Sequence, residues 1–283
     1  MKFGVNTFIW SAGFGAAEIE LLPTIREKGF DGVEIPLFGA DKIHPSIVRS
    51  AMAANQLECN FCSVFPAPFS LISDRAEVRQ QTLTHFSDCV KAAAEAGSKL
   101  IAGPLYSPVG QLPGRRRTSD EWQWAVDGYQ KIGDTLTSYG VTIAIEPLNR
   151  FETYFLNTAA DAVQLCEEIN HPNVGILFDT FHANIEEKDI AAALHSTGKH
   201  LRHFHACEND RGTPGSGHIE WASTLSALKA MGYDQWVTIE SFGFSIPEIA
   251  GAAAIWRDLA SSPEAIAWDG VRFLRRELGQ VQA

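Results

Sequence analysis

The sequence predicts an α/β protein that folds as a single (β/α)8 TIM barrel spanning residues 1–283. Short runs of β-branched and aromatic residues alternate with longer helical patterns, as expected for parallel strand–helix units. Eight such runs can be counted, and closed barrels of about 250 residues commonly form one domain. No linker or low-complexity tract marks a second domain, and no G-x-G-x-x-G or G-x-x-x-x-G-K-[ST] motif favours an open nucleotide-binding sheet.

The eight expected strands recur at regular intervals along the chain. They begin at Phe3, Gly32, Glu58, Lys99, Val141, Val174, His200 and Gln235. The turns from helix to strand carry a glycine where a left-handed cap is expected, at Gly29, Gly97, Gly140 and Gly232. Between them, apolar residues at helical spacing predict amphipathic helices, most clearly from Trp122 to Leu136. Residues 264–278 predict an extra C-terminal helix, which could close the bottom of the barrel or contact another subunit.

Composition excludes several classes of partner. The formal net charge of −11 argues against nucleic acid, because phosphate binding requires a basic face. No apolar run approaches the length of a membrane span, and no secretory signal is recognised at the N-terminus. The five cysteines lack the spacing of a disulfide framework. We therefore expect a cytoplasmic protein with no membrane partner.

Four potential metal ligands follow successive strand-like runs in the second half of the chain: Glu146, Asp179, His205 and Glu240. The gaps between them are 33, 26 and 35 residues, each about the length of one strand–helix unit. The carboxyl ends of barrel strands converge on one mouth, so these side chains should meet there. Three carboxylates and one imidazole suit Mn²⁺ or Mg²⁺ and tolerate Co²⁺ or Zn²⁺. Of the pair His203 and His205, we expect one imidazole to lie instead in the layer between sheet and helices.

The chemistry that this arrangement favours is proton transfer next to a carbonyl group. A metal that polarises the carbonyl acidifies the neighbouring C–H bond, and Glu146 and Glu240 could serve as base and acid on opposite faces of the carbon. Arg211, in a glycine-rich loop after the seventh strand, suits recognition of a substrate with several oxygens. Taken singly, a strand-end carboxylate could instead cap a helix, and Arg211 could be solvated.

Several longer motifs resemble the ketose 3-epimerases, the D-tagatose, D-allulose (D-psicose) and L-ribulose 3-epimerase group within the xylose-isomerase-like barrels. The motifs are Glu146-Pro-Leu-Asn-Arg-Phe-Glu152, Asp179-Thr-Phe-His-Ala-Asn-Ile-Glu-Glu187, His203-Phe-His205 with Glu208-Asn209, Pro214-Gly-Ser-Gly217 and Ile239-Glu-Ser-Phe242. The resemblance extends over essentially the whole chain.

The resemblance implies a small-molecule ketose substrate and one divalent metal ion, Mn²⁺ before Co²⁺ or Mg²⁺. Glu146, Asp179, His205 and Glu240 would hold the metal, and the two glutamates would invert C3 through a cis-enediolate. Glu152, His182 and Arg211 would bind the O1–O3 region of the substrate, and Cys62 would line the far side of the pocket. A homodimer or homotetramer is expected.

Some residues depart from the family pattern, and three other functions remain open. Ser241 stands where the family often has proline, and Tyr106 stands near a position that is often tryptophan, where we expect contact with the tail of the sugar. A hydroxypyruvate-isomerase-like or inosose-processing enzyme would share this fold and metal site. An abasic-site endonuclease would require a basic face and further histidines where this chain has Glu34 and Cys62. A non-catalytic sugar-binding barrel would have no need for both glutamates.

Overall fold

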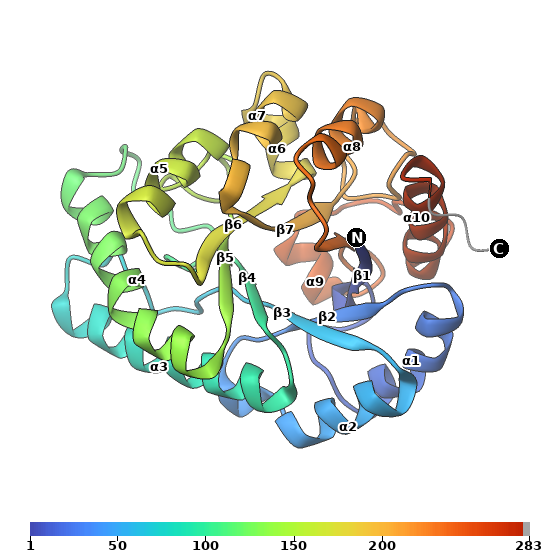
Figure 1. Cartoon of the computed structure of the whole chain (residues 1–283), viewed down its shortest axis with the longest axis horizontal. Coiled ribbons are helices and arrows are strands. Elements are labelled where there is room, and N and C mark those ends of the chain that lie inside the picture. Colours follow the sequence, from blue (N-terminus) through green and yellow to red (C-terminus); the bar gives the residue numbers. More distant parts are fainter. Residues whose placement is uncertain (280–283) are drawn as a thin grey trace.

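A computed structural model, which describes residues 1–279, contains the predicted closed barrel (Figure 1). All eight strands are parallel, and β8 pairs with β1 to close the ring. The strands are β1 (Lys2–Asn6), β2 (Gly32–Pro36), β3 (Glu58–Cys62), β4 (Leu100–Gly103), β5 (Thr142–Ile145), β6 (Val174–Asp179), β7 (Leu201–Ala206) and β8 (Trp236–Ile239). Each strand begins within one residue of its predicted start.

Helices surround the barrel in the order expected from the sequence (Figure 1). They are α1 (Ala16–Glu27), α2 (Pro45–Asn55), α3 (Ala76–Ala96), α4 (Ser119–Tyr139), α5 (Ala159–Ile169), α6 (Thr180–Glu186), α7 (Ile190–Ser196), α8 (Trp221–Ala230), α9 (Pro247–Ala252) and α10 (Pro263–Glu277). Short 3₁₀ turns cover Thr7–Ile9, Ala40–Lys42 and Gly198–His200. The four predicted cap glycines all have positive φ, between 63° and 94°, so the expected left-handed turns are confirmed.

Two helices follow the last strand. The short α9 lies at the mouth, where Ile249 and Ala252 line the pocket described below. The predicted C-terminal helix is α10, which packs on the barrel: a Cβ added at Gly270 would lie 2.8 Å from the Ile239 side chain of β8. The Arg275 guanidinium donates to the carbonyl of Gly29, 3.1 Å from Nε, and so ties α10 to the end of α1.

The strands bury both of their faces, so the interior of the barrel is filled with side chains rather than open. The carboxyl ends of the strands meet at one mouth, and the loops that follow them form its rim. Within residues 1–279, no helix is both long and apolar enough to cross a membrane.

Candidate active site

The structure brings the four strand-end residues Glu146, Asp179, His205 and Glu240 together at the mouth. All are buried, and one ligand atom from each lies within 4.8 Å of the others. Glu146 follows β5, Asp179 ends β6, His205 lies in β7 and Glu240 follows β8. Four neighbouring strands therefore each contribute one side chain.

Three atoms that face this cluster are buried without a hydrogen-bond partner: Glu146 Oε1, Asp179 Oδ2 and His205 Nδ1. His205 Nδ1 lies 3.5 Å from Asp179 Oδ2 and 3.4 Å from Glu240 Oε1. Leaving buried polar atoms unpaired is costly. A divalent cation would satisfy all three at once, so the donor set fits a hard metal ion.

Asp179 is oriented by the helix that follows it. Its Oδ1 accepts hydrogen bonds from the backbone N–H groups of Phe181 (2.6 Å) and His182 (3.3 Å) and so caps α6. Because Oδ1 is occupied in this way, Oδ2 faces the cluster. Capping a helix and holding a metal ion looked like alternatives for Asp179 in the sequence, but they would use different oxygens of its carboxylate.

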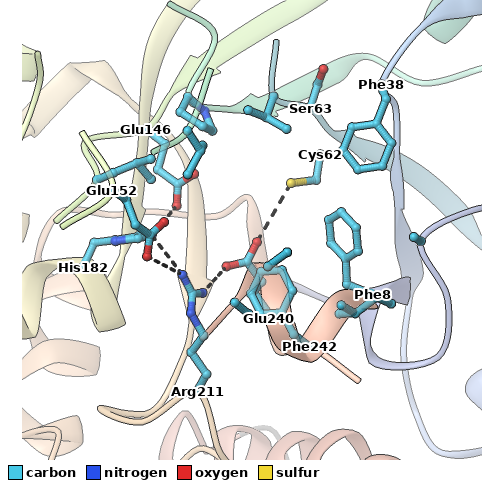
Figure 2. A pocket seen from close by; sticks show the side chains of 18 of the residues that line it. Phe8, Phe38, Cys62, Ser63, Glu146, Glu152, His182, Arg211, Glu240 and Phe242 are labelled. Atoms are coloured by element: carbon cyan, nitrogen blue, oxygen red, sulfur yellow. Dashed lines mark hydrogen bonds and ion pairs between the residues drawn. The ribbon is translucent and has the colours of Figure 1, made fainter. Parts of the chain in front are cut away.

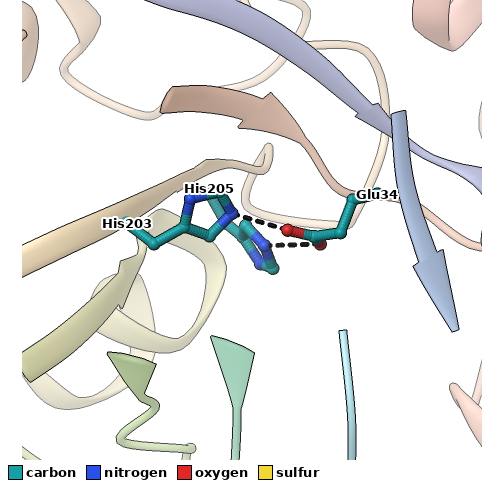
Figure 3. A group of neighbouring side chains, drawn as sticks. All are labelled: Glu34, His203 and His205. Atoms are coloured by element: carbon teal, nitrogen blue, oxygen red, sulfur yellow. Dashed lines mark hydrogen bonds and ion pairs between the residues drawn. The ribbon is translucent and has the colours of Figure 1, made fainter. Parts of the chain in front are cut away.

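Glu34 on β2 is a site residue that the sequence analysis missed (Figure 3). It is fully buried, and its Oε1 accepts from His205 Nε2 at 2.9 Å while Oε2 accepts from His203 Nε2 at 2.6 Å. Asn6 also donates to it, at 2.9 Å. A hydrogen on Nε2 of His205 leaves Nδ1 as the free ligand atom, so Glu34 sets both the tautomer and the direction of this imidazole.

The expectation that His203 and His205 occupy different layers is wrong. Residues two apart in a strand share a face, and both imidazoles point into the barrel toward Glu34 (Figure 3). Burial acts to raise the pKa of Glu34, but the interactions with His205 and His203 outweigh it and lower the pKa below its usual range. Glu34 therefore remains an acceptor for both rings.

The two glutamates of the cluster differ in their electrostatic surroundings. Burial, Glu240 and Asp179 raise the pKa of Glu146 well above its usual value. Burial also acts to raise the pKa of Glu240, but His205 and Arg211 outweigh it and lower the pKa. Arg211 causes part of this asymmetry, because its guanidinium lies 3.1 Å from Glu240 Oε2.

A pocket of about 270 Å³ is lined by two members of the cluster, Glu146 and Glu240 (Figure 2). One side is polar, with Glu152, His182 and Arg211 beside Glu146 and Glu240. Arg211 bridges this side, since its second terminal nitrogen lies 3.4 Å from Glu152 Oε1. The opposite wall is mostly apolar, and its members include Phe8, Phe38, Val109, Phe242 and Ile249.

His182 presents one defined ring nitrogen to the pocket. The backbone N–H of Asn149 donates to Nδ1 at 3.0 Å, so the ring hydrogen is on Nε2, which lies 3.7 Å from Glu146 Oε1. Burial and the nearby Arg211 lower the pKa of His182 to about 3. His182 is therefore a neutral hydrogen-bond donor.

Cys62 and Tyr106 occupy different environments. Cys62 lines the pocket with Sγ 3.9 Å from Glu240 Oε1, and burial raises the pKa of its thiol well above the usual value. The loop after β4 reaches the pocket through Pro104 and Val109, but Tyr106 itself does not line it. Its buried hydroxyl instead donates to the carbonyl of Glu146 at 3.1 Å.

A parallel barrel with a buried acidic site at its mouth is typical of barrel enzymes. Comparison with known proteins shows to which family of barrel enzymes this chain belongs. Residues 22–277 match the model of the xylose isomerase-like TIM barrel family. A Synechocystis sp. protein named "Probable ketose 3-epimerase" is 38% identical over 276 residues, covering 98% of this chain and 96% of that protein. The ketose 3-epimerase of Arthrobacter globiformis is 30% identical over 287 residues, covering 100% of this chain and 98% of the relative.

The structure supports the same relationship. A D-allulose 3-epimerase from Methylomonas sp. superposes with a TM-score of 0.93 at 25% identity and covers 98% of each chain. The chain belongs to the ketose 3-epimerase family, within the xylose isomerase-like barrels. It is a carbohydrate epimerase, an enzyme of the isomerase class.

Proposed function

We propose that the protein is a metal-dependent 3-epimerase of free ketoses of the D-tagatose, D-allulose and L-ribulose type. The observation that carries the proposal is the buried cluster of Glu146, Asp179, His205 and Glu240, which opens onto a pocket with one polar side. The two glutamates of this cluster could transfer protons, and all four side chains together could hold a metal ion.

Glu146, Asp179, His205 and Glu240 would hold one divalent ion, with Mn²⁺ as the first choice and Co²⁺ or Mg²⁺ as substitutes. Oxygen-rich sites with a single imidazole favour such hard ions, whereas thiolate-rich sites select zinc. When bound, the ion would polarise the C2 carbonyl and so acidify the C3–H bond.

The two glutamates would act on opposite faces of C3. In one direction, the Glu240 carboxylate would take the C3 proton. The C–H electron pair would form the C2–C3 double bond while the C2–O2 π pair moves onto O2, which gives a cis-enediolate. Protonated Glu146 would then give its proton to the other face of C3 while the electron pair on O2 re-forms the C2 carbonyl, and the configuration at C3 is inverted. The reverse reaction exchanges the two roles.

Recognition would concentrate on the O1–O3 end of the sugar. Glu152, His182 and Arg211 stand beside the two glutamates and supply an acceptor and two donors. Among the described residues that line the pocket, Arg211 is the one cationic side chain, and Glu152 and Glu240 already neutralise it. A phosphorylated tail would therefore meet the apolar wall without a counter-charge, which favours an unphosphorylated substrate.

The test is a panel of ketohexoses and ketopentoses, each incubated in D₂O with the Mn²⁺-loaded protein. We expect deuterium at C3 and a C3-inverted product from free ketoses, with kcat/KM far above that for fructose 6-phosphate or ribulose 5-phosphate. An aldose product would favour an aldose–ketose isomerase, and inversion at C4 would favour a 4-epimerase. An inosose is incubated in parallel, and its loss of water would favour a lyase. Any of these results would overturn the proposal.

A further inference from the structure

The backbone of Arg211, a residue that lines the pocket, has an energetically unfavourable conformation. Its φ of 65° lies in the left-handed region, which side chains other than glycine rarely adopt. The guanidinium is buried between the rings of Phe181 and Phe242, at 4.0 and 4.6 Å from their centroids. Something else in the structure must hold this backbone, because isolated arginine residues prefer other conformations.

One candidate is Glu208, a fully buried carboxylate with no cation partner among the described residues. Four N–H groups satisfy it instead. Oε1 accepts from the backbones of Asn209 (3.1 Å) and Ile219 (3.0 Å), and Oε2 accepts from the backbone of Gly215 (2.8 Å) and the indole of Trp221 (2.9 Å). The carboxylate thus joins both ends of the loop that carries Arg211.

The loop packs closely around this carboxylate. A Cβ added at Gly217 would lie 2.7 Å from Glu208 Oε1 and 2.0 Å from Asn209 Oδ1, so the backbone there approaches too closely for a side chain. The Glu208 carbonyl also accepts from the Arg211 N–H at 2.9 Å. Glu208 therefore restrains Arg211 on the N-terminal side.

Ser241 restrains Arg211 on the other side. Its buried hydroxyl donates to the Arg211 carbonyl at 2.5 Å. Ser241 directly follows Glu240, so this hydrogen bond connects the end of β8 to the loop after β7. A residue at position 241 without a side-chain donor, such as proline, could not make it.

We propose that Glu208 and Ser241 are positioning residues that hold Arg211 in its left-handed conformation and thereby set the affinity of the site for substrate. Neither lines the pocket. The effect on substrate affinity rests on the proposed function, whereas the effect on loop order does not.

The first test measures loop order by hydrogen–deuterium exchange of the metal-loaded protein. Ser241→Ala and Glu208→Gln should each speed exchange of the amides of Arg211, Gly215 and Ile219 by at least roughly tenfold, while strand β4 keeps its wild-type protection. Ser241→Thr keeps a hydroxyl and should restore protection. Wild-type exchange of the loop in both variants would overturn the proposal.

The second test separates substrate binding from turnover, with D-allulose as substrate. Ser241→Ala should raise KM by roughly tenfold, as expected for one lost hydrogen bond, and change kcat by less than about threefold. Ser98→Ala is the matched control, because Ser98 Oγ is also buried and donates to a backbone carbonyl, that of Leu100, at the start of β4 rather than at the mouth. It should leave KM unchanged.

A double-mutant cycle identifies the residue through which Ser241 acts. In an Arg211→Ala background, Ser241→Ala should have no further effect on KM. The Ser241→Ala single variant should bind Mn²⁺ with wild-type affinity, as measured by calorimetry. A persisting effect on KM without Arg211, or weakened Mn²⁺ binding, would show that Ser241 acts through Glu240 and would overturn the proposal. If the wild type converts no ketose, the proposed function fails, and the exchange experiment still decides whether the loop is held in this way.

Discussion

Glu146 and Glu240 lie at equivalent strand ends of one mouth, yet Arg211 contacts only Glu240. Glutamine at either position keeps the size and one oxygen ligand but cannot accept the proton. We expect Glu146→Gln and Glu240→Gln each to lower kcat by at least roughly a hundredfold with Mn²⁺ still bound. Turnover and metal content should be measured together, with Glu58→Gln, an exposed change on β3, as control. If a variant retains both the metal and normal turnover, the glutamate that it replaces does not transfer the proton.

Glu34 is expected to act on the metal without touching it. Glu34→Gln replaces one acceptor of the two imidazole hydrogen bonds with an amide nitrogen, so His205 loses part of its orientation. Changes of this kind weaken metal binding by roughly 10- to 100-fold, and we expect titration calorimetry with Mn²⁺ to show this loss. Unchanged affinity would mean that packing alone orients His205.

At the scale of elements, the sequence was most informative where local chemistry determines the structure. Strand starts were predicted to within one residue because apolar runs and cap glycines mark them. The role of Glu34 escaped prediction because its partners lie on β7, 169 and 171 residues away in sequence. The pocket-lining position of α9 likewise depends on how distant parts of the chain come together in the barrel.

The end of β4 contains a tightly restricted position. Gly103 has a φ of 128°, and a Cβ there would lie 2.2 Å from the Ser63 carbonyl oxygen. Its own carbonyl accepts from the Glu146 N–H at 3.1 Å. We expect Gly103→Ala to lower the free energy of unfolding by more than about 2 kcal/mol, because strain and overlap add.

Gly140→Ala provides the comparison for Gly103. Gly140 also has a positive φ, of 63°, but among the described residues no heavy atom beyond its two chain neighbours lies within 4 Å of an added Cβ. The cost there should be about 1 kcal/mol, from the left-handed conformation alone. Urea denaturation of both variants checks the difference, and equal losses would contradict the role assigned to the contact with Ser63.

At the scale of the whole molecule, the proposed ion would join four strands. A ligand that binds only the folded state stabilises it, so chelation should abolish activity and lower the melting temperature, and Mn²⁺ or Co²⁺ should restore both. Calorimetric melting with and without chelator tests this, with Mg²⁺ addition as a comparison. Loss of metal that leaves both activity and melting temperature unchanged would refute the metal site.

The cluster comes from the second half of the chain, whereas the apolar wall draws on both halves. Glu146, Asp179, His205 and Glu240 lie in or directly after β5–β8. On the other side of the pocket, Phe8, Phe38 and Cys62 follow or end β1–β3, and Phe242 and Ile249 follow β8. The part of the wall that follows β1–β3 can therefore be exchanged without replacing any of the four cluster residues. A chimaera of two relatives, joined within the α4 unit, would take all four cluster residues from one parent and the wall residues after β1–β3 from the other, as long as the parent of the first half supplies Glu34.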